Sequence, residues 1–119
     1  MRRFTDLKVW ERSHELVLRV YRLTAAFPQA ELFGLTSQLR RASVSVPANI
    51  AEGAKRKSQK DFARFLNVAE GSLSEVEYLP GLSRDLGYLN ESDVAPVLAE
   101  ASAVLKMLAS LRRTVERSR

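Results

Sequence analysis

The chain has 119 residues and a formal net charge of +5, from 19 basic and 14 acidic side chains. This length suits one domain, residues 1–119, whose core needs no disulfide or metal to hold it. The absence of cysteine excludes disulfides, thiolate zinc sites and cysteine nucleophiles, and the single histidine, His14, excludes a multi-histidine metal site within one chain. The first residues mix charges, so no signal peptide is expected. No apolar run reaches the roughly 18 residues that a membrane span needs.

The spacing of apolar residues is helical along almost the whole chain. A first helix is predicted from Asp6 to Ala26, with Thr5 as its N-cap and Pro28 ending it. Two apolar seams about 100° apart run along it, so its apolar face is wider than one groove of a bundle needs. The first seam holds Leu7, Trp10, His14, Val17, Tyr21 and Thr24, and the second holds Val9, Ser13, Leu16, Val20, Leu23 and Phe27.

A second helix is predicted from Thr36, after the turn residue Gly34, to Ala54. Pro47 lies in the middle of this helix, lacks a backbone N–H and would clash with the carbonyl of Ser43. A kink or a break is therefore predicted at Pro47.

A third helix is predicted to start at Ser58, because Ser58–Asp61 resembles a capping box. It should run to Leu86, where Gly87 suits the residue that follows a helix end. Pro80–Gly81 should bend this helix near its last two turns.

A fourth helix is predicted to start near Ser92. Its apolar residues alternate steps of three and four over three heptads: Val94, Val97, Ala101, Val104, Leu108, Leu111 and Val115. No strand pattern competes with these helices. Four long helices with short connections predict an all-α fold, an antiparallel up-down-up-down four-helix bundle.

The apolar surface of the first and fourth helices exceeds what a monomeric bundle needs. On the fourth helix the excess consists of Leu98, Leu105 and Met107. We expect these faces to form contacts between subunits, and a broad core within a monomer is the alternative.

Most of the positive charge falls at one end of the predicted bundle, where the first and third helices start and the second and fourth end. This end carries thirteen of the 19 basic and five of the 14 acidic residues. Such a surface attracts phosphates in a salt-dependent way. We define its candidate nucleic-acid-binding residues as the basic pole: Lys55, Arg56, Lys57, Lys60, Arg64, Arg112, Arg113 and Arg117. The alternative is a solvated surface whose cations only complement helix dipoles.

No catalytic, metal or cofactor site is predicted, so the chain is expected not to be an enzyme. Glu11 and His14 have the spacing of a di-iron ligand pair, but His14 is the only histidine and falls on an apolar seam. It is therefore interpreted as a buried or interface residue. Glu70 has no partner base and is interpreted as solvated surface. Phe62 and Phe65 lie near the basic pole at core spacing and are interpreted as core rather than a stacking surface.

Several stretches together resemble one protein family. They are Phe4–Trp10, Phe27–Leu35, Gly34–Arg41, Ser45–Gly53, Ala69–Glu75 and Leu86–Leu89. They resemble the four-helix-bundle proteins associated with intervening sequences of bacterial large-subunit ribosomal RNA, also labelled S23 ribosomal proteins. The resemblance implies a cytoplasmic bacterial protein that forms homo-oligomers, expected to be pentamers, without catalytic residues. A related branch resembles the accessory proteins of diversity-generating retroelements, which work with RNA and a reverse transcriptase.

The leading hypothesis is a non-enzymatic, self-associating helical bundle that binds RNA, or an RNA-containing complex, through the basic pole. Repetition of the basic pole in a ring of subunits would add avidity. The alternative is a protein-interaction scaffold whose basic pole meets an acidic protein partner. Neither hypothesis involves a membrane or a cofactor.

Overall fold

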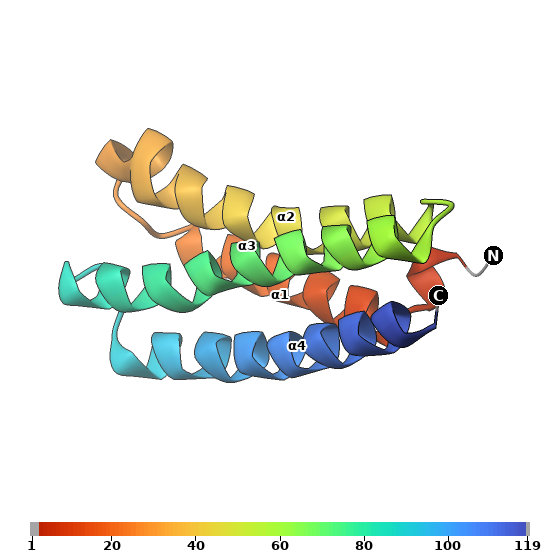
Figure 1. Ribbon diagram of the computed structural model, residues 1–119. Coiled ribbons are helices and arrows are strands. Elements are labelled where there is room, and N and C mark those ends of the chain that lie inside the picture. The colour runs from red at the N-terminus through yellow and green to blue at the C-terminus, as the bar shows by residue number, and fades with distance from the viewer. Residues whose placement is uncertain (1–2, 119) are drawn as a thin grey trace.

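The computed structural model describes residues 3–118 and is all-helical over that range. Four long helices form a bundle: α1 (Lys8–Thr24), α2 (Ser37–Ala54), α3 (Gln59–Asp85) and α4 (Glu91–Arg117). Figure 1 shows successive helices running in opposite directions, with both ends of the chain at the same end of the bundle. Each helix packs mainly against two others, so that α1 contacts α2 and α4, and α3 does the same. The predicted four-helix bundle is confirmed.

The core consists of one apolar stripe from each helix. On α4 the stripe is the predicted heptad seam, from Val94 to Val115, which is buried except for the half-buried Leu111. On α1 the stripe is the second predicted seam, in which Val9, Ser13, Leu16 and Val20 are all buried, Leu23 is half-buried and Phe27 lies beyond the end of the helix. The heptad and helical spacing of apolar residues therefore located the core correctly.

The other seam of α1 lies on the flank of the bundle rather than at its centre. Val17 and Thr24 are buried, but His14 and Tyr21 are exposed. The prediction of a buried His14 is wrong for the single chain: its ring stacks on Trp10 at the surface. Burial of His14 between subunits stays a prediction.

Side-chain caps mark the starts of α3 and α4. The Ser58 hydroxyl accepts a hydrogen bond from the N–H of Asp61 and caps α3, as predicted. Asn90 and Asp93 form a capping box at the start of α4, one residue before the predicted start. Gly87 has a φ of 87°, which explains why glycine ends this turn.

The two ends of α1 differ from the prediction. Phe4–Asp6 forms a separate turn of 3-10 helix, η1, and α1 begins only at Lys8 without a side-chain cap. After α1, the chain turns through two short helices, η2 (Gln29–Glu31) and η3 (Leu32–Thr36), before α2. These short elements have no periodicity that a sequence pattern could reveal.

The prolines do not interrupt their helices. Helix α2 continues through Pro47 and α3 through Pro80, and both prolines are buried. The Asn49 amide donates a 2.7 Å hydrogen bond to the carbonyl of Ser45 in the turn that contains Pro47. A kink at Pro47 and a bend at Pro80–Gly81 stay predictions.

Within residues 3–118, α4 is the one helix long and apolar enough by length and composition to cross a membrane. Core helices of globular bundles meet the same criteria, and the heptad seam of α4 packs into the bundle core. Fewer than a third of the residues in its most apolar stretch are buried. Leu98, Leu105 and Met107 are half-buried, so part of the predicted apolar excess lies at the surface of a single chain.

Candidate nucleic-acid interface

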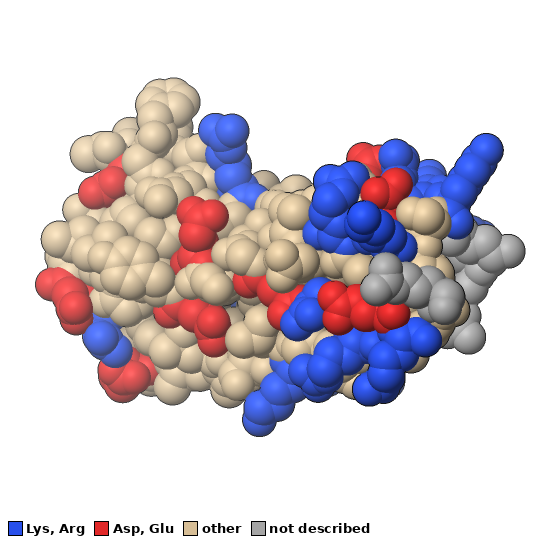
Figure 2. All heavy atoms as spheres, viewed as in Figure 1, with Lys and Arg blue, Asp and Glu red and all other residues tan. Residues whose placement is uncertain are grey.

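The fold brings the residues of the basic pole to one end of the molecule. They come from the connection after α2, the first turns of α3 and the last turns of α4. Figure 2 shows lysine and arginine side chains gathered at this end, while acidic and uncharged surface prevails at the other end of the same face. Arg2 and Arg119, which the charge count of this end includes, lie outside the described residues.

Five residues of the basic pole are exposed and form no ion pair with an acidic residue anywhere in the described range 3–118. They are Lys55, Lys57, Lys60, Arg113 and Arg117. Their charge is therefore available to an anionic partner. Lys60 also lies in the first turn of α3, where backbone N–H groups and the helix dipole favour anions.

Two arginines of the basic pole are partly neutralised at the surface. Nη2 of Arg56 lies 3.1 Å from a carboxylate oxygen of Glu52, and Nε of Arg64 lies 3.7 Å from Asp61. All four side chains are well exposed, so these pairs contribute little stability and leave the arginines free to exchange a carboxylate for a phosphate.

Arg112 has a different role from the rest of the basic pole. Its guanidinium forms a forked ion pair with Glu70 of α3, joining α3 to α4, and a second pair with Glu116 one turn along α4. The hydrogen bond to Glu70 raises the pKa of Arg112 above its ordinary value. The side chain of Glu70 is only 16% exposed, so its interpretation as solvated surface is wrong. Glu70 holds Arg112 in a structural contact between helices.

The two phenylalanines near the basic pole have unequal positions. Phe62 is half-buried and packs against the core, as predicted. Phe65 is half-buried at the surface, with the guanidinium of Arg64 4.6 Å and that of Arg56 5.5 Å from its ring centre. Phe65 therefore forms cation–π contacts with Arg56 and Arg64 at the surface, in addition to any packing against the core.

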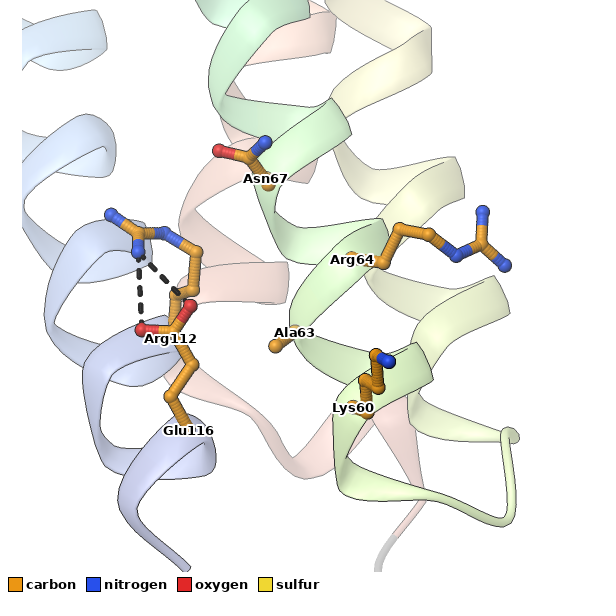
Figure 3. A pocket seen from close by; sticks show the side chains of 6 residues that line it. All are labelled: Lys60, Ala63, Arg64, Asn67, Arg112 and Glu116. Atoms are coloured by element: carbon orange, nitrogen blue, oxygen red, sulfur yellow. Dashed lines mark hydrogen bonds and ion pairs between the residues drawn. The ribbon is translucent and has the colours of Figure 1, made fainter.

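A hollow of about 550 Å³ lies between the start of α3 and the end of α4. It is lined by Lys60, Ala63, Arg64, Asn67, Arg112 and Glu116. Figure 3 shows Arg64 directed away from Arg112, which binds Glu116 on the opposite side. The cations do not converge on one point, so this surface suits an extended polyanion better than a single small anion. No cluster of metal-ligating side chains occurs among residues 3–118.

The fold and this surface define an all-helical four-helix-bundle protein with a basic end. The model of the 23S rRNA-intervening sequence protein family matches residues 5–110, and the chain belongs to that family. Comparison with curated proteins gave no match. Among solved structures, the chain is similar to a protein of unknown function from the S23 ribosomal protein family of Bacteroides thetaiotaomicron. The TM-score is 0.81 at 24% identity, over 88% of this chain and 95% of the other.

Proposed function

We propose that this chain is a non-enzymatic bundle that binds RNA in the bacterial cytoplasm through the basic pole, in which Arg112 keeps its structural contact with Glu70 and the other residues meet the phosphates. The observation that carries the proposal is the set of five exposed, unpaired cations from three segments at one end of the molecule. Phosphates that meet these cations release condensed counterions, so binding should weaken steeply as salt rises. The family name is a further reason to test RNA first.

The test measures binding to a labelled structured RNA and to a matched duplex DNA by fluorescence anisotropy across a salt series. One variant combines Lys55→Glu, Arg56→Glu and Lys57→Glu. The matched control combines Arg19→Glu, Arg22→Glu and Arg41→Glu, three exposed arginines outside the basic pole, with the same change in net charge. Binding should be lost in the first variant and largely kept in the control.

Two results would contradict the proposal. Equal losses in both variants would show that net charge, rather than the basic pole, attracts the RNA. Absence of RNA binding at low salt would favour the alternative function, a scaffold whose basic pole meets an acidic protein.

We propose also that the chain self-associates, and the resemblance makes a pentamer the expected state. The support is apolar surface on the single chain: Phe33 is 93% exposed at the turn before α2, and Leu98, Leu105 and Met107 of α4 are only half-buried. Monomeric soluble proteins rarely leave such surface open to water. Sedimentation equilibrium should give a mass several times 13.4 kDa, and a monomer at all accessible concentrations would refute self-association.

A further inference from the structure

A row of aromatic rings extends from the basic end of the bundle along α1. The rings of Phe4 and Trp10 are 5.2 Å apart and meet edge to face, at 67°. The rings of Trp10 and His14 are also 5.2 Å apart and nearly parallel, at 4°. We call Phe4, Trp10 and His14 the aromatic ladder. Trp10 and His14 meet because residues four apart lie on the same face of a helix.

Only part of the aromatic ladder packs against the core of the bundle. Trp10 packs partly against the core, and Phe4 is half-buried beside it. His14 is exposed, with one ring face on the indole of Trp10. Because His14 is exposed, the part of its ring that Trp10 does not cover is accessible to a further planar group.

Positive charge lies beside the aromatic ladder. The ammonium of Lys55 lies 6.0 Å from the ring centre of Phe4, so the ladder begins at the basic pole. Of the acidic residues nearby, Glu52 is paired with Arg56. Asp6, Glu11 and Glu15 are exposed and follow Phe4, Trp10 and His14 closely in the sequence. Aromatic faces next to unpaired cations are the combination with which proteins hold single-stranded nucleic acids, because the bases stack and the phosphates meet the cations.

We propose that the aromatic ladder is a stacking site for an unpaired base of single-stranded RNA, placed on the exposed ring of His14, with the strand's phosphates on Lys55 and its neighbours. This inference rests on the proposed function and adds the class of RNA that is bound. It takes the place of the predicted burial of His14 between subunits, because it needs the ring to stay exposed in any oligomer. A duplex cannot use the site, because its bases are already stacked within the helix, whereas the bases of loops and ends can splay onto an aromatic ring.

Trp10 is the single tryptophan of the chain, so its fluorescence reports on the ladder alone. The test titrates the protein with an oligouridine strand and, separately, with a hairpin duplex RNA of matched length. The oligouridine should change the Trp10 emission and the duplex should not. His14→Ala should weaken oligouridine binding by about tenfold, within the range found for loss of one base–aromatic stack, and should leave duplex binding unchanged.

The matched control is Tyr78→Ala, which removes an exposed aromatic ring on α3, outside the aromatic ladder, and should leave oligouridine binding unchanged. Glu11→Gln should strengthen oligouridine binding, because it removes one of the acidic neighbours of the ladder. Both His14 and Glu11 are exposed, so neither variant should affect folding.

The outcomes separate this inference from the proposed function. If both RNAs bind equally and His14→Ala changes nothing, the basic pole binds RNA but the aromatic ladder does not, and the inference is overturned. If neither RNA binds, the proposed function fails and the inference with it. If the Trp10 emission changes on dilution of the protein without RNA, the ladder lies between subunits, which also overturns the inference.

Discussion

The hydroxyl of Tyr88 donates a hydrogen bond of 2.9 Å to Oε2 of Glu31, a residue 57 positions earlier in the chain. The other carboxylate oxygen of Glu31 accepts a hydrogen bond of 3.1 Å from the backbone N–H of Leu35. One side chain therefore caps the short helix η3 before α2 and ties it to the turn between α3 and α4. The ring of Tyr88 also contacts Phe27, with ring centres 5.8 Å apart, so apolar packing supports the same link.

Removal of the Glu31 carboxylate should destabilise the fold more than removal of the Tyr88 hydroxyl. Glu31→Ala loses two hydrogen bonds to a charged acceptor and should cost about 2 kcal/mol, while Tyr88→Phe loses one and should cost about 1 kcal/mol. Urea unfolding measures both, and the double variant should cost less than the two single costs together. Glu75→Ala, at an exposed position on α3, is the control. Equal values for all three variants would show that the link has no structural role.

The Tyr88 phenol should titrate above pH 10, because the hydrogen bond to Glu31, burial and the carboxylate charge all raise the pKa of Tyr88. Because the pKa of Tyr88 is higher in the folded than in the unfolded state, the protonated phenol stabilises the fold fully at pH values below the unfolded-state pKa. This stabilisation is lost as the pH rises through the folded-state pKa. Ultraviolet absorbance should show this raised titration, which should be absent in Tyr88→Phe and shifted to lower pH in Glu31→Gln. An unchanged titration in Glu31→Gln would contradict the assignment.

Local patterns in the sequence were sufficient to predict most of the fold. The heptad seam of α4 and the second seam of α1 depend only on residues three and four apart, and both proved to be core. The Ser58 cap and the helix end at Gly87 likewise depend on a few adjacent residues. The predicted start of α1 was wrong because no side chain caps η1 or α1: the N-cap residue of α1 is Leu7, which has no side-chain hydrogen-bond acceptor that a sequence pattern could reveal.

The contacts that define the surface could be predicted only in part. The pairs Glu31–Tyr88 and Glu70–Arg112 join residues 57 and 42 positions apart, and no pattern within one sequence matches such partners. The stacking of His14 on Trp10 had a signal, their spacing of four residues, but the seam they share was interpreted as core. The basic pole was predictable because helix directions alone decide which chain segments share an end.

Gly53 and Gly71 form a matched pair for testing the packing of α2 against α3. A Cβ at Gly53 would lie 2.7 Å from Cβ of Phe65 and 3.0 Å from Cδ1 of Phe62, whereas nothing lies within 4 Å of one at Gly71. Gly53→Ala should therefore destabilise by about 1–3 kcal/mol through overpacking. Gly71→Ala should stabilise by about 0.5–1 kcal/mol, because alanine restricts the unfolded chain and favours a helix. Thermal unfolding measures the stability of both variants. If both were more stable than the parent chain, α2 and α3 could move apart to admit the Cβ at position 53 without a loss of stability.

Arg112 and Lys60 line the same hollow but should contribute to different properties. Loss of Arg112 should lower stability and leave RNA binding unchanged, whereas loss of Lys60 should weaken RNA binding and leave stability unchanged. Arg112→Gln breaks the partly buried pair with Glu70 and should cost about 1–2 kcal/mol, between the values for exposed and buried pairs. Lys60→Gln should leave stability within about 0.5 kcal/mol. If Lys60 meets one phosphate, its loss should lower the slope of log affinity against log salt by about 0.7–0.9, while Arg112→Gln should leave the slope unchanged. A reduced slope in Arg112→Gln alone would mean that Arg112 leaves Glu70 to bind RNA, and that the structural role assigned to this pair is wrong.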